Sequence, residues 1–186
     1  MNALEALHTR SSNPRLSDPA PDASALENIY KAAFRAADHA VLRPWRFLVI
    51  SGSARERLGD LFAEAASLAD PAVSEEKLQS LRMKPLRAPM ILVTICSPKE
   101  HPKVPMIEQE LSAAAATQNM LLAAYAQDIG AIWRTGAMAY DRTVMRGLGL
   151  APNETITAFV YLGTVSGAVK QLNDPPIQDY FQAWQV

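Results

Sequence analysis

The chain has few cysteines and no excess of positive charge. It contains one cysteine, Cys96, within the apolar run 90–96, so a disulfide scaffold is excluded and the residue reads as part of a buried strand. The formal net charge is −1. Lysine and arginine are spread among the acidic residues, which excludes the basic footprint of a nucleic-acid binder.

Signals for export and membrane insertion are also lacking. Residues 1–10 show no charged segment followed by a long apolar stretch, so no secretory signal is visible. No apolar run approaches the roughly 20 residues that span a bilayer. We therefore expect a soluble, cytoplasmic protein with no membrane and no nucleic-acid partner.

The familiar catalytic motifs are missing as well. His8, His39 and His101 lie far apart and form no metal-ligand spacing, and neither a GxSxG elbow nor a P-loop occurs. Cys96 has no recognisable activating neighbour, and burial in an apolar strand raises a thiol pKa. We expect no metal site and no side-chain nucleophile, so a cofactor would carry the chemistry if this is an enzyme.

Local patterns predict one domain over residues 1–186, although two interlocked chains could share the core. Capping-box pairs, Ser24 with Glu27 and Ser53 with Glu56, mark two helix starts. The periodicity predicts the following elements: helices over 2–8, 25–37, from 53 onward, 74–83, 108–128 and 141–148, and strands over 45–51, 90–97 and 155–163. This order predicts an α+β sandwich with a mixed central sheet flanked by helices. It lacks the Gly-rich first turn of a dinucleotide-binding doubly wound fold.

Two segments suggest a partner chain. The helix over 108–128 is apolar round much of its circumference, and its small residues 113–116 would allow close helix approach, so we interpret it as core plus dimer interface. The tail 164–186 has little periodicity yet carries Tyr180, Phe181 and Trp184. Such a tail is expected to pack against another subunit, with swapping possible.

Three polar clusters are candidate ligand contacts. Arg10-Ser11-Ser12 could hold a phosphate, or could simply end a solvated helix. The run from Arg35 through Asp38-His39 joins a helix to a strand and could grip a ligand, or Asp38 and His39 could pair with each other.

The third cluster, Trp133-Arg134-Thr135, follows the long apolar helix. A buried guanidinium without an anion is costly, so Arg134 points to an anionic ligand such as phosphate. Trp133 could instead be an ordinary core aromatic. From the residues alone, the three clusters indicate an anion or flat-ring ligand at an interface.

In order and spacing, four motifs resemble the nitroreductase family of flavoproteins in its short single-domain form. They are the N-terminal "ALxxxxxR-S" helix, "AAFRAADHAVLRPWRFLVI", "EQELSAAAATQNMLLAAYAQDIGAIWRTG" and "ITAFVYLGT". The resemblance implies an α+β homodimer with two FMN molecules at the interface, which neither subunit completes alone.

Residue by residue, the resemblance implies FMN contacts from all three clusters, and the flavin rather than a side chain would do the chemistry. The implied contacts are Arg10, Ser11, Ser12, Arg35, His39, Trp133, Arg134 and Thr135. Residues 123–128 correspond to a stretch proposed for the nicotinamide nucleotide. The chain departs from the family at Ser11, where a second Arg is usual, and at Ala36-Ala37, where Ala-Pro is usual.

The function implied by the resemblance is FMN-dependent oxidation and reduction. Hydride would come from NADH or NADPH and pass to an electron-poor small molecule, nitroaromatic or quinone-like, in ping-pong turnover. The alternatives are a flavin store or redox sensor without efficient turnover, and a helical dimer that has lost its cofactor. The physiological acceptor and the choice between NADH and NADPH stay open.

Overall fold

The computed structural model describes residues 1–168 and 171–185. The α-helices are α1 (Ala3–Thr9), α2 (Ala23–Ala33), α3 (Ala54–Ala69), α4 (Glu75–Arg82), α5 (Met106–Tyr125) and α6 (Arg142–Gly147). The strands are β1 (Leu16–Ser17), β2 (Trp45–Ser51), β3 (Met90–Cys96), β4 (Gly130–Arg134) and β5 (Thr155–Val165). Short 3-10 helices are η1 (His39–Val41), η2 (Pro85–Arg87), η3 (Ala137–Ala139) and η4 (Ile177–Asp179). The α+β class is confirmed; β1 and β4 were not anticipated.

The sheet is built around β5, which pairs with β3, β4 and β1. Leu162 of β5 faces Met90 of β3 and Ala131 of β4, so these two strands lie on opposite edges of β5. Each pairing within the described residues is antiparallel, where the sequence led us to expect a mixed sheet. The reason lies in the connections: two helices between β2 and β3 return the chain antiparallel, and β5 separates β3 from β4, which run in the same direction.

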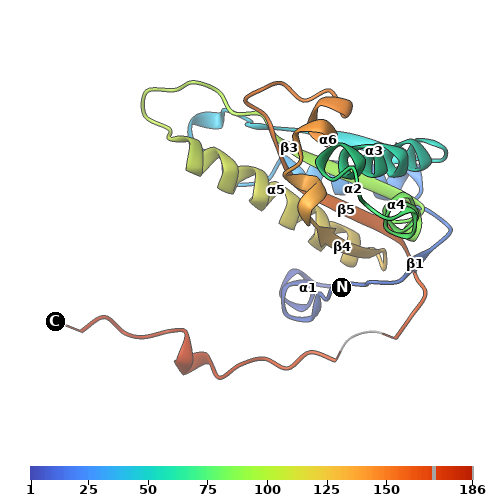
Figure 1. Ribbon diagram of the computed structural model, residues 1–186. Coiled ribbons are helices and arrows are strands. Elements are labelled where there is room, and N and C mark those ends of the chain that lie inside the picture. The colour runs from blue at the N-terminus through green and yellow to red at the C-terminus, as the bar shows by residue number, and fades with distance from the viewer. Residues whose placement is uncertain (169–170, 186) are drawn as a thin grey trace.

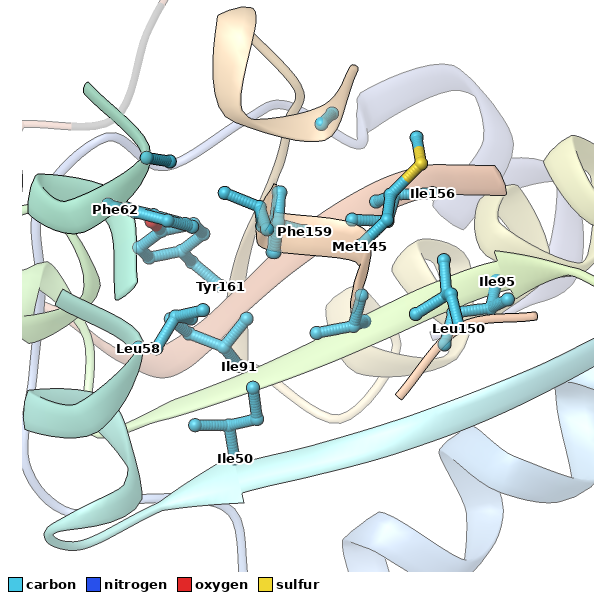
Figure 2. Packing of buried hydrophobic residues seen from close by; sticks show 14 of the residues in the cluster. Ile50, Leu58, Phe62, Ile91, Ile95, Met145, Leu150, Ile156, Phe159 and Tyr161 are labelled. Atoms are coloured by element: carbon cyan, nitrogen blue, oxygen red, sulfur yellow. The ribbon is translucent and has the colours of Figure 1, made fainter. Parts of the chain in front are cut away.

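Side chains alternate across the sheet and form two apolar layers. Ile91, Val93 and Ile95 of β3 join the layer under α3 and α6, whereas Met90 and Leu92 join the layer under α2 and α5. Figure 2 shows the first layer, in which Phe62 of α3 meets Phe159 and Tyr161 of β5. The Phe62 and Phe159 rings make an edge-on contact with centroids 5.5 Å apart. The uninterrupted apolar run of β3 is thus buried on both faces, as its pattern predicted.

Several helices are capped or end at residues other than those predicted. Asp22 caps α2 by accepting from the Ala25 N–H at 2.8 Å, so Ser24 is not the cap, and the helix ends at Ala33 rather than residue 37. Ser53 precedes α3 but is itself in a helical conformation and makes no side-chain cap. The capping box at Ser53 was therefore wrong. Ser74 caps α4 and Asp141 caps α6, each at the residue where the sequence predicted the helix to begin.

Helix α5 packs on the sheet and against α2, and leaves its remaining side uncovered. Ala113 and Ala116 are fully buried within this chain, which agrees with the predicted core role of this helix, whereas Ala114 and Ala115 are half-buried. The uncovered stripe holds Ile107, Leu111 and Ala115. Figure 1 shows the C-terminal segment running away from the helices and sheet, and its described residues 171–185 are all exposed. Within the described chain, no helix is both long and apolar enough to cross a membrane.

Candidate functional site

The N-terminal segment lies along the start of β4. The Asn13 N–H donates to the Ala131 carbonyl at 2.9 Å, and the Ala131 N–H donates to Asn13 Oδ1 at 3.4 Å. A Cβ on Gly130 would come within 2.5 Å of Leu16 Cδ2, so glycine permits this close approach. These contacts place the Arg10-Ser11-Ser12 cluster beside the strand that ends in Arg134, about 10 Å from Ala131 along the strand. Two of the three predicted clusters therefore share one region.

Tertiary contacts also hold the end of α1 in place. The Tyr125 hydroxyl donates to Thr9 Oγ1 at 3.0 Å, which ties α1 to the last residue of α5. Arg10 closes α1 through its backbone N–H, which donates to the Ala6 carbonyl. The Arg10 side chain is partly exposed, and Ser11 is buried while Ser12 is exposed. One cation and two hydroxyl groups, which can all bind anionic oxygens, therefore follow one another at the end of α1.

At the other end of β4, Trp133, Arg134 and Thr135 line a cavity of about 340 Å³. The Arg134 guanidinium lies over the Tyr161 ring, with Cζ 5.7 Å from the ring centroid. Burial raises the pKa of the Tyr161 phenol, which therefore stays protonated at neutral pH. Trp133 packs partly buried on the apolar layer under α5, so it combines a core contact with a place on the cavity wall.

Two buried polar atoms in this region have no partner. Among the described residues, Ser11 Oγ and Arg134 Nε are the side-chain nitrogen and oxygen atoms that are buried without a hydrogen bond. Buried polar groups are normally satisfied, and each orphan costs free energy. Both belong to residues singled out from the sequence, and a bound group with acceptor oxygens would satisfy the arginine. The residues present therefore fit an anionic ligand such as the FMN that the sequence motifs implied.

Arg35 and His39 lie elsewhere, where α2 and η1 meet the start of α5. His39 Nδ1 is 2.6 Å from Glu108 Oε2, and the Ser112 hydroxyl donates to the Ala37 carbonyl at 2.7 Å. Asp38 and His39 do not pair, because Asp38 Oδ2 accepts from the Arg43 N–H instead. Arg35 is exposed at the edge of a cavity of about 670 Å³.

The predicted contacts therefore form two groups in a single chain. The Arg35–His39 group is attached near Glu108, and the Arg10 group is attached at Tyr125. With a rise of about 1.5 Å per residue, these points on α5 are about 25 Å apart. One chain alone does not bring the eight predicted residues into one site.

Lys84 and Arg87 were missed by the sequence analysis. Lys84 precedes η2 and Arg87 is its last residue, and both line the same cavity as Arg134. Burial lowers the pKa of the Lys84 ammonium, and the nearby cations Lys77, Arg87 and Arg134 lower it further. The sequence does show two cations on either side of a proline just before a buried strand. No local pattern, however, indicates that they lie near β4.

The structure also describes the surroundings of the remaining candidate groups. Within the described residues, no group of three or more His, Cys, Asp or Glu side chains is placed to hold a metal. Burial raises the pKa of the Cys96 thiol to about 11. The predicted nicotinamide stretch keeps its Gln127 side chain engaged with α2, where the amide accepts from Asn28.

Comparison with known proteins covers nearly the whole chain. Residues 7–164 match the model described as "Nitroreductase family". The Escherichia coli (strain K12) protein named "Putative NAD(P)H nitroreductase YdjA" is 38% identical over 185 residues, covering 97% of this chain and 100% of that protein. Identity at this level over nearly the full length of both chains shows that the two proteins are related.

Two solved structures share the fold. A nitroreductase-like family protein from Bacillus cereus superposes with a TM-score of 0.81 at 22% identity, covering 98% of this chain and 96% of that one. A nitroreductase with bound FMN from Bacteroides fragilis NCTC 9343 superposes with a TM-score of 0.73 at 20% identity, covering 98% of this chain and 100% of that one. At this identity the two structures bear on the fold alone.

Proposed function

The chain belongs to the nitroreductase family, and we propose that it is an FMN-dependent oxidoreductase. It takes hydride from NADH or NADPH and passes it to an electron-poor acceptor, nitroaromatic or quinone-like, in ping-pong turnover. The observation that carries the proposal is the pair of buried, unpartnered atoms Ser11 Oγ and Arg134 Nε. The relative named as an NAD(P)H nitroreductase supports the hydride source, and the related structure with bound FMN shows that this fold can hold that cofactor.

One half of the cofactor site lies along the segment beside β4. Arg10, Ser11 and Ser12 would hold the FMN phosphate, ribityl chain or pyrimidine edge, since a guanidinium and two hydroxyls suit anionic oxygens. Trp133, Arg134 and Thr135 would lie against the cofactor from the end of β4. The loop from Gly136, whose positive φ of 66° suits glycine, turns the chain away after these contacts.

Arg35 and His39 would act across a dimer interface. His39 lies about 25 Å from the Arg10 group along α5, which excludes a shared contact within one chain, and Arg35 lies between residues held by Asn119 and Ser112. In a twofold dimer whose two α5 helices run antiparallel, the Arg35 end of one chain meets the Arg10 end of the other. Two equivalent sites then form, each completed by both copies.

Apolar surface supports this dimer. Leu111 on the uncovered side of α5 is 61% exposed, and Leu4 and Leu7 of α1, which is tied to the C-terminal end of α5, are also exposed. Trp184 in the tail is 91% exposed, and Tyr180 and Phe181 are also exposed. Large apolar side chains exposed together usually mark an interaction surface. We place the α5 stripe in the interface and the tail across the partner subunit.

FMN, when bound, supplies the hydride chemistry. The chain's own residues then have positional and electrostatic roles. Arg10 and Arg134 place positive charge where negative charge develops on reduction, in a region from which the dimer excludes bulk water. No side-chain acid or base is needed for hydride transfer, in keeping with the lack of any motif for one.

The experiment is the visible spectrum of the purified protein, followed by anaerobic addition of NADH and of NADPH. We expect a yellow protein whose flavin band bleaches with at least one of the two and returns with 4-nitrobenzamide. A colourless protein that takes up no added FMN refutes the cofactor. A yellow protein that neither nucleotide bleaches refutes the oxidoreductase and supports the flavin store or redox sensor.

A further inference from the structure

Three positively charged side chains line one side of the cavity at the end of β4. Lys84 and Arg87 approach it from η2, and Arg134 approaches it from β4. No ion pair within the described residues involves any of the three. The charged groups that perturb the pKa of Lys84 are all cations. Three cations with no described carboxylate between them favour an anion in this cavity.

The opposite wall of the cavity is aromatic. Phe62 of α3 and the two β5 residues Phe159 and Tyr161 line it, and Figure 2 shows these three side chains grouped together. The cation–π contact of Arg134 with Tyr161 joins the charged wall to the aromatic wall. The cavity thus pairs a flat apolar surface with positive charge.

The size of the cavity favours a small ligand. Its volume of about 340 Å³ lies at the lower end of the range for ligand pockets, which suits one aromatic ring rather than a dinucleotide. Trp133 and Thr135, which we place against FMN, line the same cavity. A ligand held here would therefore lie next to the proposed flavin position.

We propose that Lys84 and Arg87, together with Arg134, form a specificity site for electron acceptors that carry a carboxylate or similar anion on an aromatic ring. The inference rests on the proposed function and deepens it, because it names the class of acceptor. The cations bind the anionic group, and the aromatic wall supports the ring. Neutral acceptors react at the same flavin without this contact.

The test compares 4-nitrobenzoate with its neutral analogue 4-nitrobenzamide. For each protein, the ratio of the two kcat/KM values is measured with NADH in excess. Comparing that ratio between variants cancels the intrinsic reactivity of the two acceptors. In Lys84→Met and in Arg87→Met we expect the ratio to fall about tenfold, since a hydrogen bond to a charged group is lost. The Lys99→Met variant, which removes an exposed lysine remote from this cavity, should keep the wild-type ratio.

A binding measurement accompanies the kinetics. Benzoate, which accepts no electrons here, is titrated calorimetrically into each protein, and its Kd should rise about tenfold in both cavity variants and not in the control. An unchanged ratio and an unchanged benzoate Kd overturn the proposal. Loss of FMN from the cavity variants assigns the cations to the cofactor and also overturns it. The proposal is also overturned if the variants change the preference for NADPH over NADH but leave the ratio of the two acceptor kcat/KM values unchanged.

The two proposals fail in different ways. If the wild-type protein holds no FMN, the oxidoreductase proposal fails, whatever benzoate does. If the protein holds FMN and reduces 4-nitrobenzamide but shows no effect of Lys84 or Arg87 on carboxylate binding, only the acceptor inference fails.

Discussion

The Arg46–Glu154 ion pair allows a quantitative prediction about acid stability. Arg46 Nε donates to Glu154 Oε1 at 2.7 Å, and Arg46 Nη2 donates to Glu154 Oε2 at 2.6 Å. Glu154 Oε2 also accepts from the Ala151 N–H at 2.9 Å. The pair connects β2 with the turn before β5, and Glu154 is only 5% exposed. We predict that Glu154→Gln destabilises the protein at neutral pH and much less in acid.

The magnitude follows from the pKa of Glu154. The hydrogen bonds from Arg46 lower it from 4.5 to about 2, despite the opposing effect of burial. With about 1.4 kcal/mol for each pH unit, the ionised carboxylate contributes about 3 kcal/mol to stability at pH 7. Because the folded-state pKa is the lower one, this contribution is complete above about pH 4.5 and is lost as the pH falls to about 2. A Gln amide nitrogen in place of Oε2 would also face two donors.

The assay is urea unfolding of wild type and Glu154→Gln, followed by far-ultraviolet circular dichroism between pH 2 and pH 7 at fixed protein and FMN concentrations. The difference in unfolding free energy should be about 3 kcal/mol at pH 7 and shrink towards pH 2. Glu27→Gln is the control, because its partner Lys31 and Glu27 itself are exposed, and we expect little change at any pH. A Glu154→Gln protein as stable as wild type at pH 7, or a pH-independent difference, would refute the reasoning.

Three further predictions concern the cofactor, the dimer and the thiol. Arg134→Ala should weaken FMN retention at least tenfold by fluorescence titration while the circular dichroism spectrum stays unchanged; a variant that unfolds but keeps FMN would show a purely structural role. Leu111→Glu on the uncovered side of α5 should give a monomer in sedimentation velocity that loses FMN, whereas Leu68→Glu, at an exposed leucine of α3, should stay dimeric; equal behaviour of the two would argue against the α5 interface. Cys96, with its pKa raised from 9.0 to about 11 by burial, should react with a thiol reagent at pH 8 about 100-fold more slowly than a free thiol, and rapid stoichiometric labelling would contradict this.

Local signals predicted most of the helices and the buried strands. The run Met90–Cys96 is apolar at nearly every position, and it forms a strand buried on both faces. Asp141 precedes α6 and accepts from the Thr143 and Val144 N–H groups, as a cap should. These features depend on neighbouring residues, so the sequence carries them directly.

The errors arose where distant contacts compete with local ones. β4 has only five residues, and its strand conformation depends on pairing with β5, which begins 21 residues after β4 ends. Serine is a favourable N-cap residue, but the Ala25 N–H donates to the Asp22 carboxylate, so Asp22 rather than Ser24 caps the helix. The family resemblance pointed to the same eight residues that local chemistry had flagged, and neither source related Lys84 to Arg134.

By itself, the sequence determined the α+β class, the polar clusters and the family, because periodicity, capping and motif order are properties of short stretches of chain. Tertiary structure alone decided that Ser11 Oγ and Arg134 Nε, which lie beside and on β4, are buried without hydrogen-bond partners. It also decided that Lys84 joins Arg134 at an aromatic cavity, and that His39 lies at the opposite end of α5 from Arg10. These relations depend on strand pairing and helix packing between residues far apart in the chain, which no local pattern specifies.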